Sequence, residues 1–399
     1  KNKTKLNIST KKYYSDIYAG VMQMRVKLKD IFDLQMGKTP SRSNLEYWNT
    51  TDYKWISIAD LTKTSKYIFE TKEYLSKSAI KDSGIKVIPA NTVVMSFKLS
   101  IGKTAITKED MYSNEAIMAF KDKHVINIIP EYIFYLFKYK NWEECSNKAV
   151  MGKTLNKATL SEIEVEICSI EKQRQIVNIL DKIMSAVDGR KQELQLLDEL
   201  IKARFVEMFG DPVKNPKGWE VVTIGDIVTE VRYGTSKPAV EGGKYPYLRM
   251  NNLTADGHLD LNDLKYIDIP DDEIEKCVVR KGDVLFNRTN SIELVGKTVV
   301  FDLQEDMIIA GYIIRVRLNK RLLPEILSQY MNLEALKDIL RSMAKGAVNQ
   351  ANINAQELRS IKVYIPDMEL QKQFIEMKNQ VDKSKVAVQK ALDETQILF

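Results

Sequence analysis

The sequence predicts an α/β protein in which two strand-rich globular domains are separated by two long helices packed as an antiparallel coiled coil. Two observations lead to this fold class: the chain repeats itself, and each copy changes from a strand-like to a helix-like pattern. The 399 residues also exceed what a single hydrophobic core normally holds. The predicted parts are a first domain with an N-terminal extension (1–168), a central helical region (169–213), a second domain (214–366) and a C-terminal helical region (367–399).

The duplication is clearest where each globular domain ends. Asn156, Leu160, Ile163, Val165, Ile167, Glu171, Gln173 and Gln175 recur at a constant offset as Asn354, Leu358, Ile361, Val363, Ile365, Glu369, Gln371 and Gln373. Upstream, Gly37 matches Gly234, and Gly102-Lys103-Thr104 matches Gly296-Lys297-Thr298. The alternating apolar triplets predict a half-buried strand, and Ser169 and Asp367 stand where a helix N-cap is wanted.

The first long helix has a heptad pattern. Its predicted seam is Ile176, Leu180, Ile183, Val187, Arg190, Leu194, Leu197, Ile201, Arg204 and Met208. Apolar residues at alternating steps of four and three favour a coiled-coil seam over the broader stripe of a helix lying on a globular core. Gly210-Asp211-Pro212 is the stop signal, which leaves roughly 39 residues and about 58 Å of helix at about 1.5 Å per residue.

The second helix is less regular. Phe374, Val381, Val388, Leu392 and Phe399 lie on its seam, but Lys378, Lys385 and Thr395 interrupt it. It should therefore pack antiparallel against the richer first helix rather than against a copy of itself, which would put the two domains at opposite ends of a helical rod. The alternative is a helical core inside one compact domain.

The domains should contain strands near 53–58, 87–97, 245–249, 284–287 and 313–318, and helices near 133–140 and 324–331.

Composition excludes several classes of function. With three cysteines and two histidines, zinc sites, disulfides and histidine-based catalysis are not expected, and no apolar run is long enough for a membrane span. The N-terminus has no apolar signal segment, so a cytoplasmic location is expected.

The net charge of +6 is unevenly distributed. Residues 1–168 hold 27 Lys and Arg against 19 Asp and Glu, whereas residues 214–366 hold 21 of each. The first domain therefore favours a polyanionic partner on bulk charge, and the second does not.

Catalytic motifs are missing. Gly-Lys-Thr begins at Gly37, Gly102, Gly152 and Gly296, but none has the second glycine of a phosphate loop five residues earlier. No dinucleotide-binding glycine pattern and no Asn/Asp-Pro-Pro-aromatic motif of amino-methyltransferases occurs. A nuclease-like Pro366-Asp367 with Glu376-Met377-Lys378 falls on a predicted helix, and the first copy has no matching carboxylates.

The centre of the chain resembles a known family. Residues 197–212, reading Leu-Asp-Glu-Leu-Ile-Lys-Ala-Arg-Phe-Val-Glu-Met-Phe-Gly-Asp-Pro, and then Asn215-Pro216-Lys217-Gly218-Trp219, resemble the central region of type I restriction-modification specificity subunits. The repeated Glu-x-Gln helix starts match as well, and the resemblance extends from about residue 27 to residue 399.

The resemblance implies a non-catalytic subunit with two target-recognition domains, each reading one half of a split double-stranded DNA sequence. The helices would then set the spacer and dock two methyltransferase subunits, and a restriction subunit would join the complex. AdoMet, ATP and Mg²⁺ would be bound by those partners, with no cofactor or metal in this chain and no membrane.

Candidate DNA contacts are cations in the repeated turns and elsewhere in the two domains, and for each of them the alternative is a solvated surface cation: Lys38, Arg42, Lys98, Lys103, Arg232, Lys237, Arg249, Arg288 and Lys297. Arg is best suited to reading guanine, and Lys mostly supplies charge to phosphates. Because the second domain has nine Arg between Arg232 and Arg359, its half-site should be richer in Arg-to-guanine contacts. The alternatives are a coiled-coil adaptor that binds proteins without DNA specificity, and an enzyme with fused catalysis, which the missing motifs oppose.

Overall fold

The computed structural model describes residues 24–98, 100–142, 155–347 and 350–397. These form two compact units: one runs up to Asp188 and includes the residues from Glu394 on, and the other is Gly189–Asp393. The division falls inside the first long helix, α7 (Ile170–Phe209), so each half of this helix belongs to a different unit. None of the described helices is apolar and long enough to cross a bilayer.

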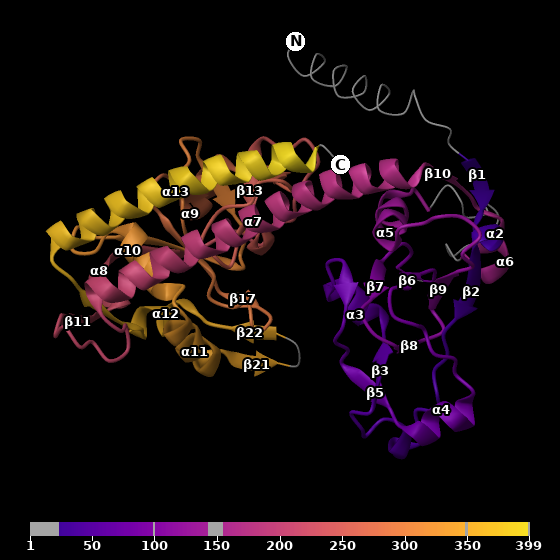
Figure 1. Cartoon of the computed structure of the whole chain (residues 1–399). Coiled ribbons are helices and arrows are strands. Elements are labelled where there is room, and N and C mark those ends of the chain that lie inside the picture. The colour runs from indigo at the N-terminus through magenta and orange to yellow at the C-terminus, as the bar shows by residue number, and fades with distance from the viewer. Residues whose placement is uncertain (1–23, 99, 143–154, 348–349, 398–399) are drawn as a thin grey trace, which may run out of the picture. The chain divides into compact units, whose positions relative to one another are not determined.

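The first unit contains two sheets (Figure 1). The larger has the order β2 (Phe32–Met36), β9 (Ile117–Asp122), β6 (Val93–Ser96), β7 (Thr104–Thr107) and β4 (Tyr67–Ile68). The smaller has the order β5 (Glu73–Leu75), β3 (Tyr53–Ile56) and β8 (Tyr112–Ser113). In the core, Phe32 and Phe120 meet edge to face at 5.8 Å, and α5 (Pro130–Tyr139) packs over the same cluster.

The second unit repeats most of this topology, although its larger sheet has no counterpart of β4 and its smaller sheet has one strand more. Its larger sheet has the order β12 (Val228–Tyr233), β20 (Ile313–Leu318), β16 (Val284–Asn287) and β18 (Thr298–Val300). Its smaller sheet has the order β14 (Lys265–Ile267), β13 (Tyr245–Leu248), β19 (Met307–Ile309) and β15 (Val278–Val279). Strands β3 and β8 pair in parallel, as do β13 and β19, so the duplication read from the sequence is also a duplication of strand order.

Short elements complete both units. Two-stranded ladders join β1 (Met24–Lys27) to β10 (Glu164–Ile167) and β11 (Glu220–Thr223) to β23 (Lys362–Ile365), and a third small sheet joins β17 (Thr289–Asn290), β22 (Gln350–Asn352) and β21 (Lys345–Ala347). The short helices of the first unit are α2 (Leu28–Ile31), η1 (Leu45–Tyr47), α3 (Ile58–Lys63), α4 (Lys77–Ser83) and α6 (Lys157–Glu162). Those of the second are α8 (Ile224–Ile227), η2 (Met250–Asn252), α9 (Asp271–Cys277), α10 (Pro324–Met331), α11 (Glu334–Met343) and α12 (Ala355–Ser360).

The sequence located most of these elements. Strands β16 and β20 and helix α10 have the predicted bounds, and β10 buries Val165 and Ile167 in the expected alternation. The predicted strand at 87–97 is too long, because its first half makes only an isolated bridge at Ile88 before β6 begins at Val93.

Helix α7 spans 40 residues and is followed by Gly210, whose φ of 87° is the left-handed geometry that a glycine stop signal supplies. The last helix, α13 (Met368–Gln396), runs antiparallel to the second half of α7 (Figure 1). Arg190 Nη1 donates to Ala391 O at 2.7 Å, Lys385 pairs with Asp198, and Phe205 packs on Phe374. Residue numbers thus fall along α13 as they rise along α7, which confirms the predicted antiparallel pair.

The prediction that α7 buries only a narrow coiled-coil seam needs a correction. In the first unit, Ile176 and Leu180 pack on the domain core, and in the second unit Ile201, Phe205 and Phe209 belong to the core cluster. Phe205 and Phe209 are fully buried although neither is a seam position. Each half of α7 is therefore a broad-striped helix on a globular core, because the sheets offer it an apolar surface that a free coiled coil lacks.

A buried glutamine anchors the start of each long helix. Gln173 Nε2 donates to Asn127 O at 3.0 Å and to Cys168 O at 2.9 Å, while its Oε1 accepts from Ile129 N at 2.9 Å. Gln371 makes the same three bonds, to Arg321 O, Pro366 O and Leu323 N. Both side chains are fully buried, so the repeated glutamine is a structural clamp that joins the helix start to the loop before α5 or α10.

Candidate nucleic-acid interface

The same glycine turn leaves the first strand of the larger sheet in both units. Gly37 N donates to Ile117 O at 3.2 Å, and Gly234 N donates to Ile313 O at 3.1 Å. A Cβ on Gly37 would lie 2.2 Å from Asn114 O, and one on Gly234 would lie 2.1 Å from Ile309 O. Only glycine allows the chain to pass this close, so the turn holds the following polar residues against the smaller sheet.

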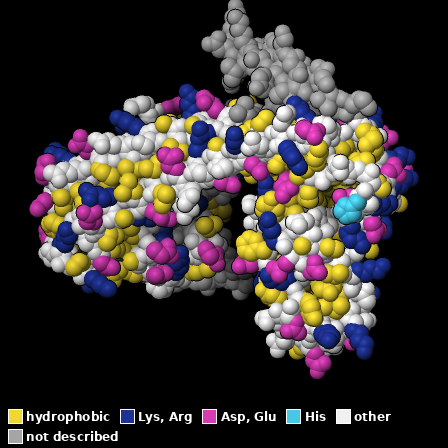
Figure 2. Space-filling view, in the orientation of Figure 1, with side chains coloured by type: hydrophobic (Ala, Val, Ile, Leu, Met, Phe, Trp, Pro, Cys, Tyr) yellow, Lys and Arg dark blue, Asp and Glu magenta, His cyan; other side chains and the backbone are white. Residues whose placement is uncertain are grey.

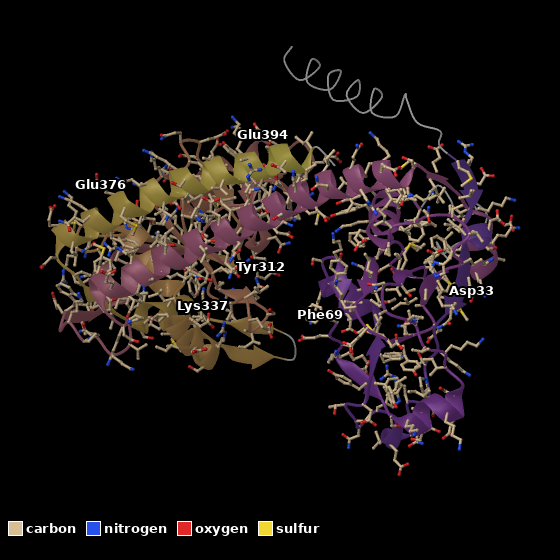
Figure 3. All side chains as sticks on the ribbon, viewed as in Figure 1. Asp33, Phe69, Tyr312, Lys337, Glu376 and Glu394 are labelled. Carbon is tan, nitrogen blue, oxygen red and sulfur yellow. The ribbon has the colours of Figure 1, made fainter. Side chains whose placement is uncertain are left out.

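In the second unit this turn borders a cleft of about 510 Å³. Three of the predicted contact residues line it together: Lys237 from the turn, Arg249 at the end of β13 and Arg288 at the end of β16. The side chain of Tyr312, labelled in Figure 3, lines the same cleft and is 49% exposed. The sequence named these cations separately, and the fold brings them to one surface.

The two arginines are not saturated by protein partners. Arg249 Nη2 donates to Asp263 Oδ2 at 2.7 Å and to Asp263 O at 2.8 Å, but its buried Nε has no partner. The Arg288 guanidinium lies 5.0 Å from the Tyr233 ring, and its buried Nε is also unpaired. Among the described residues, no carboxylate forms an ion pair with Arg288. A planar guanidinium that lines a cleft without a carboxylate partner, as Arg288 does, suits recognition of an acceptor pair such as guanine N7 and O6.

The corresponding place in the first unit is built differently. The Arg42 guanidinium lies 3.7 Å from the Trp48 ring and 4.9 Å from the Trp55 ring, and it pairs with Glu73. Trp55 Nε1 donates to Lys38 O at 3.1 Å, whereas in the second unit Tyr247 Oη donates to Thr235 O at 3.2 Å. The same turn is thus held by a Trp in one unit and a Tyr in the other.

The other first-unit candidates have their own surroundings. Lys38 Nζ donates to Ser83 O, the Lys98 ammonium is 5.3 Å from the Phe97 ring, and Lys103 is half-buried. Glu115 lies among them, and the Thr39 hydroxyl, followed by the fields of Lys98 and Arg42, lowers the pKa of its carboxyl. This surface is therefore less purely cationic than the sequence count indicated.

Two second-unit candidates lie outside the cleft. Arg232, on β12, is exposed and bonds to Glu230 Oε1 at 3.0 Å. Lys297 is only 8% exposed, and its Nζ donates to Met250 O at 2.9 Å. Its ammonium is thus bonded to a backbone carbonyl of the protein, and its predicted DNA contact stays a prediction.

Sequence reasoning missed the aromatic members, Tyr312 and Tyr233 in the second unit and Trp48 and Trp55 in the first. Trp48, Trp55 and Tyr312 are brought beside predicted cations by folding, and Tyr233, which follows Arg232 in the sequence, contacts Arg288 instead. An aromatic residue gives no signal in one sequence that separates a stacking platform from a core residue.

The predicted partner-binding residues on the helices are mostly directed inward. Val187, Ile201, Phe374, Val381 and Leu392 are buried. Ile176, Leu180, Ile183, Leu194, Leu197, Met208 and Val388 are half-buried. Apolar side chains that remain exposed lie on other faces, such as Leu196 and Leu200 on α7 and Val386 on α13. Figure 2 shows acidic and basic side chains interspersed along the helices rather than gathered by sign.

The nuclease-like pair from the sequence gains no support. Asp367 precedes α13 and Glu376 lies within it, and both are exposed. The described residues contain no group of three His, Cys, Asp or Glu side chains that could hold a metal ion.

The fold and the surface beside the glycine turn define a duplicated α/β protein. Its two units share a strand order, a glycine turn and the long helix α7, and they differ in the polar side chains beside that turn. Comparison with known proteins agrees with this description. The family model for the type I restriction modification DNA specificity domain matches residues 22–199 and again residues 216–395. The chain belongs to this family and carries its domain twice.

Relatives and solved structures support the assignment. The MjaIX specificity subunit of Methanocaldococcus jannaschii is 30% identical over 57% of this chain and 57% of its own length. The EcoKI specificity subunit of Escherichia coli K12 is 25% identical over 59% of this chain and 54% of its own length. The chain thus aligns with little more than half of these relatives.

Two solved structures share the fold over nearly the whole chain. A chain from a study of complex assembly in the type I R-M system has a TM-score of 0.59 at 18% identity, covering 94% of both chains. The type I S subunit from M. genitalium has a TM-score of 0.50 at 12% identity, covering 95% of this chain and 94% of that one. At these identities the likeness is one of fold.

Proposed function

We propose that the chain is the DNA-specificity subunit of a type I restriction-modification complex. Each globular domain reads one half of a bipartite duplex target, and the helices set the spacer and dock two methyltransferase subunits, with which a restriction subunit associates. The chain itself is non-catalytic, and AdoMet, ATP and Mg²⁺ are bound by the partner subunits.

The observation that carries this proposal is that the two units share one fold but differ in the side chains beside the glycine turn. The glycine turn, the strand order and the buried glutamine repeat, but the cleft bears Arg249 and Arg288 in the second unit and Arg42 stacked on tryptophans in the first. A protein that bound the same element twice would have no reason to diverge there. Two half-sites of different sequence explain both the repeat and the divergence.

Partner docking is supported by the exposed apolar side chains of the long helices. Leu196 and Leu200 lie one turn apart on α7 and are 55% and 42% exposed. Side chains of this kind on a charged helix are suited to a protein interface. Because the seam residues are already used within the chain, the methyltransferase subunits dock on these outer faces.

The test is to map methylated sites in a cell that carries the chain and its methyltransferase partner, with wild-type α7 and with one heptad inserted. A heptad adds about 10 Å of helix at about 1.5 Å per residue, or about three base pairs at 3.4 Å each. Both half-sites should keep their sequence while the spacer lengthens. An unchanged spacer would refute the proposal that the helices set the spacer length. Absence of sequence-selective duplex binding would favour the protein-adaptor alternative.

A further inference from the structure

A second cavity of the second unit is separate from the arginine cleft. It has a volume of about 260 Å³ and is lined by Lys297, Lys337, Lys202 and Arg341, together with Asn332 and the carboxylates considered below. Lys202 comes from α7, Lys337 and Arg341 come from α11, and Lys297 precedes β18. Figure 3 labels Lys337 on α11.

Two of these cations are buried without a counter-ion. Lys297 and Lys337 are each 8% exposed. Lys337 Nζ donates to Gly296 O at 2.6 Å and Lys297 Nζ donates to Met250 O at 2.9 Å, so each ammonium has one protein acceptor for its three protons. Within the described part of the chain, neither lysine forms an ion pair. Burying an ammonium without a compensating charge is unfavourable, and two such groups at one cavity compound the effect.

The pKa values of both lysines reflect this unfavourable burial. Burial, and then repulsion from Arg341 and Lys297, lower the pKa of Lys337 to about 8, although Glu334 acts in the opposite direction. Burial also lowers the pKa of Lys297. A lysine with a depressed pKa in the folded protein destabilises the fold while it is charged. An anion placed between the two ammonium groups would relieve that effect.

The acidic side chains that line the cavity have partners other than Lys297 and Lys337, and one of those partners, Arg341, lines the same cavity. Glu334 pairs with Arg341 at 2.5 Å, the Ser291 hydroxyl bonds to Glu293, and the Thr254 hydroxyl bonds to Asp256. Helix α11 begins at Glu334, and its N-cap residue Leu333 has no side-chain cap, which adds the positive end of a ten-residue helix to the same cavity.

We propose that this cavity is a binding site for a phosphate group, held by Lys297 and Lys337. The cavity is wide enough for a tetrahedral oxyanion with room for an attached substituent. A phosphodiester of bound DNA and a free phosphate compound would offer the same chemistry.

The test uses the full chain and inorganic phosphate, compared with chloride at matched ionic strength. Calorimetric titration should show saturable phosphate binding that weakens as the pH rises above about 8, because Lys337 then loses its proton. Lys337→Met and Lys297→Met should each weaken binding roughly tenfold or more, since a charge-assisted hydrogen bond is lost. Lys281→Met removes an exposed lysine of the same unit and should leave binding unchanged.

Amine acylation of the wild-type protein, mapped by mass spectrometry, gives a second readout that does not depend on the variants folding. Phosphate should slow modification of Lys297 and Lys337 but not of Lys281. Equal effects of phosphate and chloride in both assays would overturn the proposal.

A short mixed-sequence duplex separates the two sources of phosphate. If the site holds a DNA phosphodiester, the duplex should protect both lysines from acylation and compete with inorganic phosphate. If it holds a free phosphate compound, duplex and phosphate should bind together. Failure of duplex binding alone would count against the proposed DNA-recognition function and not against this site.

Discussion

The aromatic cluster that fixes α13 to the second unit allows a quantitative prediction. Phe374 is fully buried, with the Phe205 ring at 5.2 Å and the Phe209 ring at 5.6 Å, both at edge-to-face angles. Phe374→Ala should lower the free energy of unfolding by about 3–5 kcal/mol, because transfer energy, ring contacts and a residual cavity all contribute. At roughly 2–4 °C per kcal/mol for a unit of this size, the unfolding midpoint should fall by about 6–20 °C.

Differential scanning calorimetry of the full chain is the assay. The transition of the second unit should shift, whereas that of the first unit should stay, since Phe374 belongs to the second core cluster only. Val386→Ala is the matched control on the same helix, because Val386 is 69% exposed and its truncation should change stability by less than about 0.5 kcal/mol. A shift of equal size in both variants would refute the conclusion that α13 is anchored through its aromatic face.

Two further predictions concern the reading surface. Arg288→Met should weaken binding of the methylated target duplex by about 1–3 kcal/mol and relax base choice in one half-site, while Arg232→Met, outside the cleft, should leave base choice intact; competition binding with single-base variants measures both. Gly234→Ala should destabilise the second unit by about 1–3 kcal/mol in urea unfolding, because its Cβ would lie 2.1 Å from Ile309 O. Gly189→Ala, where a Cβ meets nothing within 4 Å in a helix, should instead stabilise by about 0.5–1 kcal/mol; destabilisation there would show that the close-approach argument does not discriminate.

Much of the architecture could be predicted because it depends on local patterns. The alternation at Val165 and Ile167, the heptads of α7 and the glycine at its end are each set by a few neighbouring residues. The repeated Gln173 and Gln371 could be found as a pair, but the sequence did not show that each is a buried clamp. That role depends on loops more than 40 residues away.

The candidate site was only partly predictable. Lys237, Arg249 and Arg288 were chosen as cations in a repeated turn and elsewhere in the second domain, and the structure gathers them in one cleft. Lys297 was chosen by the same reasoning and is buried. A cation count cannot separate these cases, because burial depends on which way a strand end faces once the sheets have formed.

The sequence by itself determined the duplication, the order of domains and helices, and the antiparallel pairing of the long helices, because periodicity and repeats are properties of the chain. Tertiary structure decided which surfaces remain free. It turned the expected coiled-coil seam into two core-facing stripes, made Phe205 and Phe209 central, and placed Lys297 among the four cations that line one cavity. The reason is that exposure and counter-charge are set by residues distant in sequence that folding brings into contact.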